Sequence, residues 1–175
     1  LGAATCGLEF HEHCTDMDVV VVPIGGGGLI GGIASISKQL NASKIIGVEP
    51  VGAALLTKSL AASKPIELET VSTIADSLGA PVSLPISYGL IERHVDEIVC
   101  VTDDEMTKAC AMFFDACKLS VEPACAAALA AICGPLRQSL AGKRIGLVAC
   151  GTNISPKAAA DLVESGKSLL AKEAA

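Results

Sequence analysis

Four consecutive glycines, Gly25 to Gly28, stand between a segment that is typical of a buried strand and one that can wind as a helix. Residues 19–24 are apolar and mostly β-branched, which predicts the strand, and residues 31–40 predict the helix. Four glycines cost more conformational entropy in the unfolded chain than a connecting turn requires. Backbone N–H groups at a helix N-terminus carry partial positive charge, and glycines let them approach a ligand closely. The junction therefore predicts an anion site, with a phosphate as the expected ligand.

Strands and helices alternate along the rest of the chain. Further strands are predicted at 44–48, 97–101 and 144–149, helices at 5–14, 52–62, 102–118, 122–134 and from about 155 onward with fraying from 167, and a loop over 63–87. Because the strands are almost entirely apolar, we expect an α/β fold of three layers, a mostly parallel sheet flanked by helices. Thr102 is expected to cap the helix that follows it.

Three segments are expected at the edge of the sheet where ligands bind, the carboxyl ends of its strands. They are the glycine run, Glu49-Pro50 and residues 150–153. Each follows a predicted strand, so a parallel sheet would bring them to the same side. Asn153 is interpreted as a residue that turns the chain, without a catalytic role.

Composition and charge narrow the classes of function. The net charge is −6 and the isoelectric point is near 5.0, so nucleic acid and anionic membranes are not expected as partners. Residues 19–36 are uncharged, but Pro23 and six glycines among them argue against a membrane-spanning helix. None of the eight cysteines forms a Cys-x-x-Cys pair, which favours free thiols in a reducing compartment such as the cytoplasm. His11 and Cys14 could share a helix face, but no second pair completes a zinc spacing.

The glycine run leaves two hypotheses open. Gly26, Gly28 and Gly31 match the spacing of the dinucleotide-binding fingerprint, and Glu49 lies about where the ribose-binding acid would be. This pattern is matched easily where four glycines run together. A dinucleotide-binding oxidoreductase is therefore one alternative hypothesis, and a non-catalytic half-enzyme that serves as a binding partner is another.

A set of segments, in order along the chain, resembles the serine/threonine dehydratase family of fold-type II pyridoxal-phosphate enzymes, which are tryptophan synthase β-like. They are residues 22–29, 47–50, 73–77, 94–97, 101–105, 121–128 and 150–153. The resemblance implies the large domain of such an enzyme. Residues 1–175 would be the C-terminal part of a domain that binds pyridoxal phosphate, mostly the large domain.

The resemblance also implies a cofactor, pyridoxal 5′-phosphate, and the residues that hold it. These residues are Gly25, Gly26, Gly27, Gly28, Leu29, Glu122 and Cys150. The glycine run with Leu29 would bind the phosphate through backbone N–H groups. Cys150 would be an uncharged partner of the pyridine nitrogen, and Glu122 would line the pocket besides favouring the dipole of its helix.

The implied activity is that of a lyase. It would dehydrate threonine, serine or another small hydroxy amino acid by β-elimination and release ammonia, with the exact substrate left open. The family further implies a homodimer.

Two features of the family are not matched in the chain. Some members bind a divalent metal through the Glu of the Glu-Pro motif, a carbonyl four residues on and an acid six residues on. Here Glu49 is followed at the third place by Leu55, which cannot ligate a hard cation, so no metal is expected. The family's Schiff-base lysine precedes the glycine run in a Ser-x-Lys segment, and no lysine fits that place. We therefore expect the N-terminal half with the catalytic lysine to be absent and residues 1–175 alone to be inactive.

Overall fold

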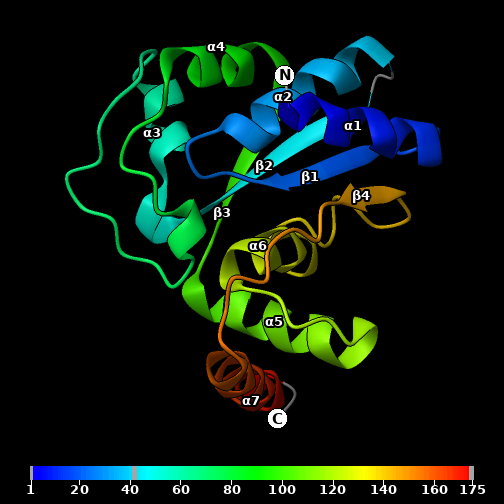
Figure 1. Ribbon diagram of the computed structural model, residues 1–175, viewed down its shortest axis with the longest axis vertical. Helices are drawn as coiled ribbons and strands as arrows, with labels where there is room; N and C mark the ends of the chain where they lie inside the picture. The colour runs from blue at the N-terminus through cyan, green and yellow to red at the C-terminus, as the bar shows by residue number, and fades with distance from the viewer. Residues whose placement is uncertain (1, 41–42, 174–175) are drawn as a thin grey trace.

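A four-stranded parallel sheet lies at the centre of the computed structural model, which describes residues 2–40 and 43–173. Its strands are β1 (Val19–Pro23), β2 (Lys44–Pro50), β3 (Glu97–Val101) and β4 (Ile145–Leu147), in the spatial order β3-β2-β1-β4. The helices are α1 (Gly2–His13), α2 (Gly28–Leu40), α3 (Leu55–Ala61), α4 (Pro85–His94), α5 (Asp103–Cys117), α6 (Pro123–Cys133) and α7 (Pro156–Glu173), with 3-10 turns η1 (Val51–Ala53) and η2 (Asp76–Leu78). Figure 1 shows α1, α2 and α4 on one side of the sheet and α5, α6 and α7 on the other. The predicted three-layer α/β fold is confirmed.

The four valines of β1 supply both faces of this sheet. Val19 and Val21 belong to the core under α5 and α6, whereas Val20 and Val22 belong to the core under α2 and α3. Side chains alternate between the two faces of a strand, so an uninterrupted apolar strand is what a sheet covered on both sides requires. Each fully buried valine stabilises the fold by about 1.5–3 kcal/mol.

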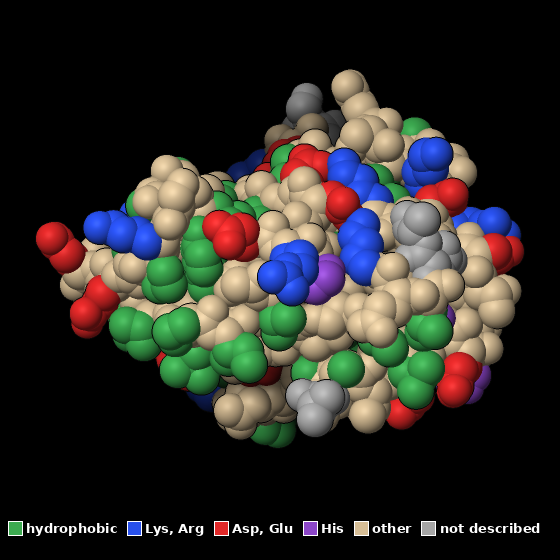
Figure 2. Space-filling view, turned by 90° about the horizontal axis from the view of Figure 1, so that it is seen from above, with side chains coloured by type: hydrophobic (Ala, Val, Ile, Leu, Met, Phe, Trp, Pro, Cys, Tyr) green, Lys and Arg blue, Asp and Glu red, His purple; other side chains and the backbone are tan. Residues whose placement is uncertain are grey.

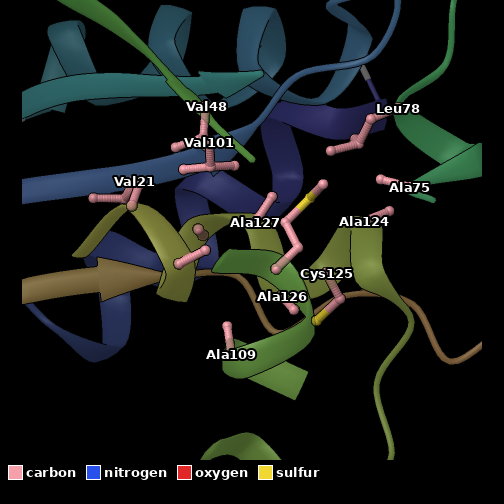
Figure 3. Close-up of a cluster of buried hydrophobic side chains, with 14 of the residues drawn as sticks. Val21, Val48, Ala75, Leu78, Val101, Ala109, Ala124, Cys125, Ala126 and Ala127 are labelled. Atoms are coloured by element: carbon pink, nitrogen blue, oxygen red, sulfur yellow. The ribbon is translucent and has the colours of Figure 1, made fainter. Parts of the chain in front are cut away.

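Helix α6 can approach the sheet closely because its side chains are small. Six of the eleven residues in its sequence, PACAAALAAIC, are alanine, and eight of the eleven are buried. Figure 3 shows Ala126 and Ala127 of this helix in one cluster with Val21 and Val48 of the sheet. The alanine run is therefore a packing surface.

Several elements differ from their predicted bounds. Helix α2 begins at Gly28, three residues earlier than predicted, so the last glycine of the run is already its first residue. Helix α4 was not predicted at all, because residues 63–87 were interpreted as a loop. It begins with Pro85 at its first position and buries Tyr88 and Ile91, but Ile86 stays exposed, which weakens its helical pattern.

Two further helices depart from expectation, and one prediction on capping holds. The predicted helix 52–62 is divided into η1 and α3, and α7 continues to Glu173 instead of fraying from 167. Thr102 caps α5 as predicted, in a capping box in which Thr102 Oγ1 accepts from Glu105 N–H and Glu105 accepts from Thr102 N–H.

None of the described helices is long and apolar enough to cross a membrane.

His11 is a buried contact between α1 and α2 and does not pair with Cys14. Its Nε2 lies 2.8 Å from Ser37 Oγ, and its Nδ1 has no partner among the described residues. Cys14 is exposed, and no group of three potential metal ligands is found within residues 2–40 and 43–173. The histidine is therefore part of the helix packing.

His11 should make the stability of the fold depend on pH. Burial lowers the pKa of His11, so the folded protein favours the neutral ring while the unfolded chain binds the proton more readily. The stability that the neutral His11 ring contributes is fully present above its pKa in the unfolded chain, about 6.5. It is lost as the pH falls through the lower pKa of His11 in the folded protein. Urea unfolding should therefore show lower stability at pH 5.5 than at pH 7.5, and His11→Gln should reduce that difference. His13→Gln, at an exposed position of the same helix, is the control; equal pH dependence in His11→Gln and wild type would contradict the assignment.

Candidate functional site

A cavity of about 250 Å³ opens beside the carboxyl end of β1 and the segment that follows β4. The glycine run and Leu29 form one part of its wall, and Glu122 and Cys150 form another. The other lining residues are Pro23, Ser77, Leu78 and Ala124. All seven residues predicted to hold a cofactor thus surround one cavity, although they come from three distant segments. Figure 3 shows two further wall residues, Leu78 and Ala124, at one end of the buried cluster.

The glycine run has two positions that only glycine fits well and one that faces open space. Gly27 has a φ of +88°, and a Cβ there would lie 2.7 Å from Ile91 Cδ1. A Cβ on Gly25 would lie 2.9 Å from the carbonyl oxygen of Ser77. By contrast, a Cβ on Gly28 would meet no atom within 4 Å. The run therefore packs tightly against η2 and α4 on one side and leaves room on the side of the cavity.

Backbone donors of the run are free to bind a ligand. The N–H groups of residues 25–29 donate to no acceptor in the described parts of the chain. They lie at the N-terminus of α2, a helix of 13 residues, where the helix dipole adds partial positive charge. Unpaired donors beside an open cradle are the arrangement that a phosphate group fits. The glycine run therefore has unpaired donors and open space at the place of the predicted anion site.

Glu122 is fixed between two neighbours at the far wall of the cavity. Its Oε2 accepts a hydrogen bond from Ser77 Oγ at 3.2 Å, and its backbone N–H donates to the carbonyl of Gly151 at 3.2 Å. Gly151 has a φ of +101°, and a Cβ there would collide with Glu122 Oε1. The side chain does not cap α6, although Glu122 is the residue before that helix. The carboxylate thus lies along the cavity wall next to the segment that carries Cys150.

Cys150 presents a neutral thiol to the cavity. The residue is partly buried and follows β4. Burial raises the pKa of the Cys150 thiol, its own backbone N–H opposes this rise, and Cys6 and then Glu122 add to it. A protonated thiol can donate a weak hydrogen bond to a ligand atom without placing a charge beside it.

Glu49 lies near the carboxyl end of β2, at the predicted edge of the sheet, but it does not line the cavity. Its side chain is fully buried, and Oε1 accepts from Leu56 N–H at 2.6 Å. Oε2 accepts from Thr57 N–H at 2.9 Å and from Thr57 Oγ1 at 2.6 Å. Burial raises the pKa of the Glu49 carboxyl, and these hydrogen bonds oppose the rise. Glu49 binds the start of α3 and cannot reach a ribose, so the dinucleotide hypothesis loses its acidic residue.

Two polar residues near the site, Ser77 and Asn153, had no predicted role in binding the cofactor, and only Ser77 lines the cavity. Ser77 was only part of a segment that carried the resemblance, yet it lines the cavity and contacts Glu122. Its place between the buried residues Ala75 and Leu78 is the signal that could have found it. Asn153 is exposed and is not among the lining residues, in line with its interpretation as a turn residue.

Comparisons with known proteins give a family match, curated relatives and similar solved structures. The family model described as pyridoxal-phosphate dependent enzyme matches residues 1–151. The phenylserine dehydratase of Ralstonia pickettii is 47% identical over 154 residues, which cover 87% of the chain and 47% of the relative. A serine racemase of Oryza sativa subsp. indica is 37% identical over 158 residues, with 87% and 46% covered. The structure of the processed form of threonine deaminase isoform 2 from Solanum lycopersicum superposes with a TM-score of 0.88 at 31% identity, covering 94% of the chain and 48% of that protein. The chain thus spans about half the length of the curated relatives named here.

Proposed function

The chain belongs to the pyridoxal-phosphate dependent enzyme family, and from this premise we propose that it forms the phosphate side and the ring-nitrogen side of the active site of a hydroxy amino acid dehydratase. The cavity that unites the glycine run with Cys150 is the observation that carries the proposal. The reaction is loss of water from a threonine-, serine- or phenylserine-like substrate to give an enamine. Its imine tautomer then takes up water and releases ammonia and a 2-oxo acid.

The residues of the chain would divide the work of holding the cofactor. The free N–H groups of residues 25–29 bind the phosphate, and the dipole of α2 favours its negative charge. The Cys150 thiol donates to the ring nitrogen and leaves it without a full positive charge. Bound pyridoxal phosphate supplies an electron-withdrawing ring that makes the α-proton of an amino acid removable. An uncharged partner of the ring nitrogen makes this withdrawal weaker, which suits a reaction whose leaving hydroxyl group takes up the electrons.

Dehydration is favoured over metal-assisted racemisation for two reasons. The dehydratase relative is 47% identical to the chain and the racemase relative 37%. Both carboxylate oxygens of the buried Glu49 accept hydrogen bonds from the start of α3, and Leu55 is buried and apolar. Neither residue is therefore placed to ligate a divalent cation.

We extend the proposal to a homodimer, as the resemblance implies, in the cytoplasm, as the free cysteines suggest. Val82, Leu84 and Ile86, next to the glycine run, are exposed, and such apolar side chains support contact with another protein surface. Figure 2 views the molecule from above. Hydrophobic side chains gather in the lower part of this picture, and acidic and basic side chains are mixed above them.

The proposed activity is tested on the whole protein that contains this chain, loaded with pyridoxal phosphate. We expect DL-phenylserine, threonine or serine to release ammonia and the matching 2-oxo acid in equal amounts, and activity to disappear when the cofactor is removed. Residues 1–175 alone are expected to release neither, since the resemblance puts the catalytic lysine outside them. A whole protein that binds the cofactor but releases no ammonia from any of the three substrates would contradict the proposal.

A further inference from the structure

Ser77 connects two parts of the cavity wall that the proposed function treats separately. It lies in η2, whose backbone packs against Gly25 of the glycine run. Its hydroxyl points to the other part of the wall, where Oγ is 3.2 Å from Glu122 Oε2. An ionised carboxylate is only an acceptor, so the serine hydroxyl is the donor. Among the described residues Ser77 is the only side chain that donates to the Glu122 carboxylate.

The Glu122 carboxylate is held from both sides. Ser77 binds Oε2, and the Cα of Gly151 lies so close to Oε1 that no side chain fits between them. Gly151 directly follows Cys150, and the Glu122 N–H to Gly151 carbonyl bond joins the two segments. If Ser77 lost its hydroxyl, Oε2 would lose its donor and the carboxylate would be free to turn toward water.

Glu122 is the charged group that acts on Cys150. The other titratable neighbours are thiols, Cys6 from α1 and Cys125 from α6. Burial raises the pKa of Cys6, and burial raises the pKa of Cys125 to about 12, so both stay neutral near pH 8. A negative charge beside a thiol disfavours the thiolate. The charge of Glu122 therefore adds to the effect of burial in keeping Cys150 protonated.

We propose that Ser77 is a positioning residue, which holds the Glu122 carboxylate against Gly151 so that Cys150 stays a protonated thiol and can donate to the cofactor ring nitrogen. The last step rests on the proposed function, whereas the link from Ser77 through Glu122 to Cys150 is a property of the protein alone. The two can therefore be tested separately.

Site-specific alkylation of Cys150 tests the link without any cofactor. Trypsin releases residues 145–157, in which Cys150 is the only cysteine, so iodoacetamide uptake at this thiol can be followed by mass spectrometry. At pH 8 we expect Glu122→Gln to raise the alkylation rate about fivefold, because the thiolate is no longer disfavoured. Ser77→Ala should raise it at least about twofold, and Ser77→Thr, which keeps the hydroxyl, should restore the wild-type profile of rate against pH.

The double variant that combines Ser77→Ala with Glu122→Gln shows whether Ser77 acts through Glu122 or affects Cys150 independently. If Ser77 acts through Glu122, Ser77→Ala adds nothing to the rate of Glu122→Gln. A Ser77→Ala profile equal to wild type, or rate increases that multiply in the double variant, would overturn the proposal. Protection of Cys150 from alkylation by pyridoxal phosphate is measured in parallel on the whole protein. Loss of protection with the expected variant profiles would refute the cofactor assignment and leave the Ser77–Glu122 link standing.

Discussion

Gly28→Asp is expected to weaken pyridoxal-phosphate binding by at least about a hundredfold and to leave the fold intact. A Cβ at this position meets no atom within 4 Å, so the new side chain has room. Gly28 is the first residue of α2, where an aspartate favours the helix dipole by about 0.3–1 kcal/mol. The same carboxylate stands among the free N–H groups of the cradle, where it repels a phosphate that carries nearly two negative charges.

Equilibrium dialysis of the whole protein with pyridoxal phosphate measures this effect, and thermal unfolding checks the fold. Gly28→Asn is the matched control, because it has the same size without the charge and should lose much less affinity than the aspartate. Unchanged affinity in Gly28→Asp would place the phosphate elsewhere. Equal losses in both variants would show that space in the cradle, and not its charge, decides binding.

Local patterns predicted the sheet and the place of the glycine run, and the family resemblance supplied the residues that now line the cavity. Four β-branched residues before four glycines define β1 and the start of α2, and the order of elements requires β1, β2 and β3 to be parallel. Since parallel strands end on one side, Cys150 could be placed near Gly25 without any knowledge of contacts. Helix α4 was missed because Ile86 is exposed and no clear apolar stripe identifies the helix.

Strand and helix patterns alone could not predict which side chains at the sheet edge face the cavity; only the family resemblance separated Cys150 from Glu49. Glu49 and Cys150 both follow strands, yet one is buried and the other lines the wall. The difference lies in what comes next in the chain. After Glu49 the backbone turns through η1 and brings the N–H groups of Leu56 and Thr57 back to the carboxylate. After Cys150, Gly151 takes a positive φ and the chain turns toward Glu122.

Glu49→Ala is expected to lower the free energy of unfolding by roughly 3–5 kcal/mol. Three donors lose their acceptor: the N–H of Leu56, the N–H of Thr57 and Thr57 Oγ1. The position is fully buried, so water cannot easily replace the carboxylate, and the shorter side chain leaves a void. Since whole domains are stable by only about 5–15 kcal/mol, this loss is a large fraction of the total.

Urea unfolding of a graded series tests this role of Glu49. Glu49→Gln keeps one acceptor oxygen but turns an NH₂ group toward backbone donors, so its loss should fall between that of alanine and that of Thr57→Val, which removes a single donor at about 1 kcal/mol. Stability of Glu49→Ala near that of wild type would contradict the assignment. Magnesium or calcium should raise the melting temperature of wild type no more than that of Glu49→Gln. A cation effect that needs Glu49 would instead make it a metal ligand. In this chain the N–H groups of Leu56 and Thr57 and the Thr57 hydroxyl stabilise the buried Glu49 carboxylate by hydrogen bonds, so no cation is needed for that purpose.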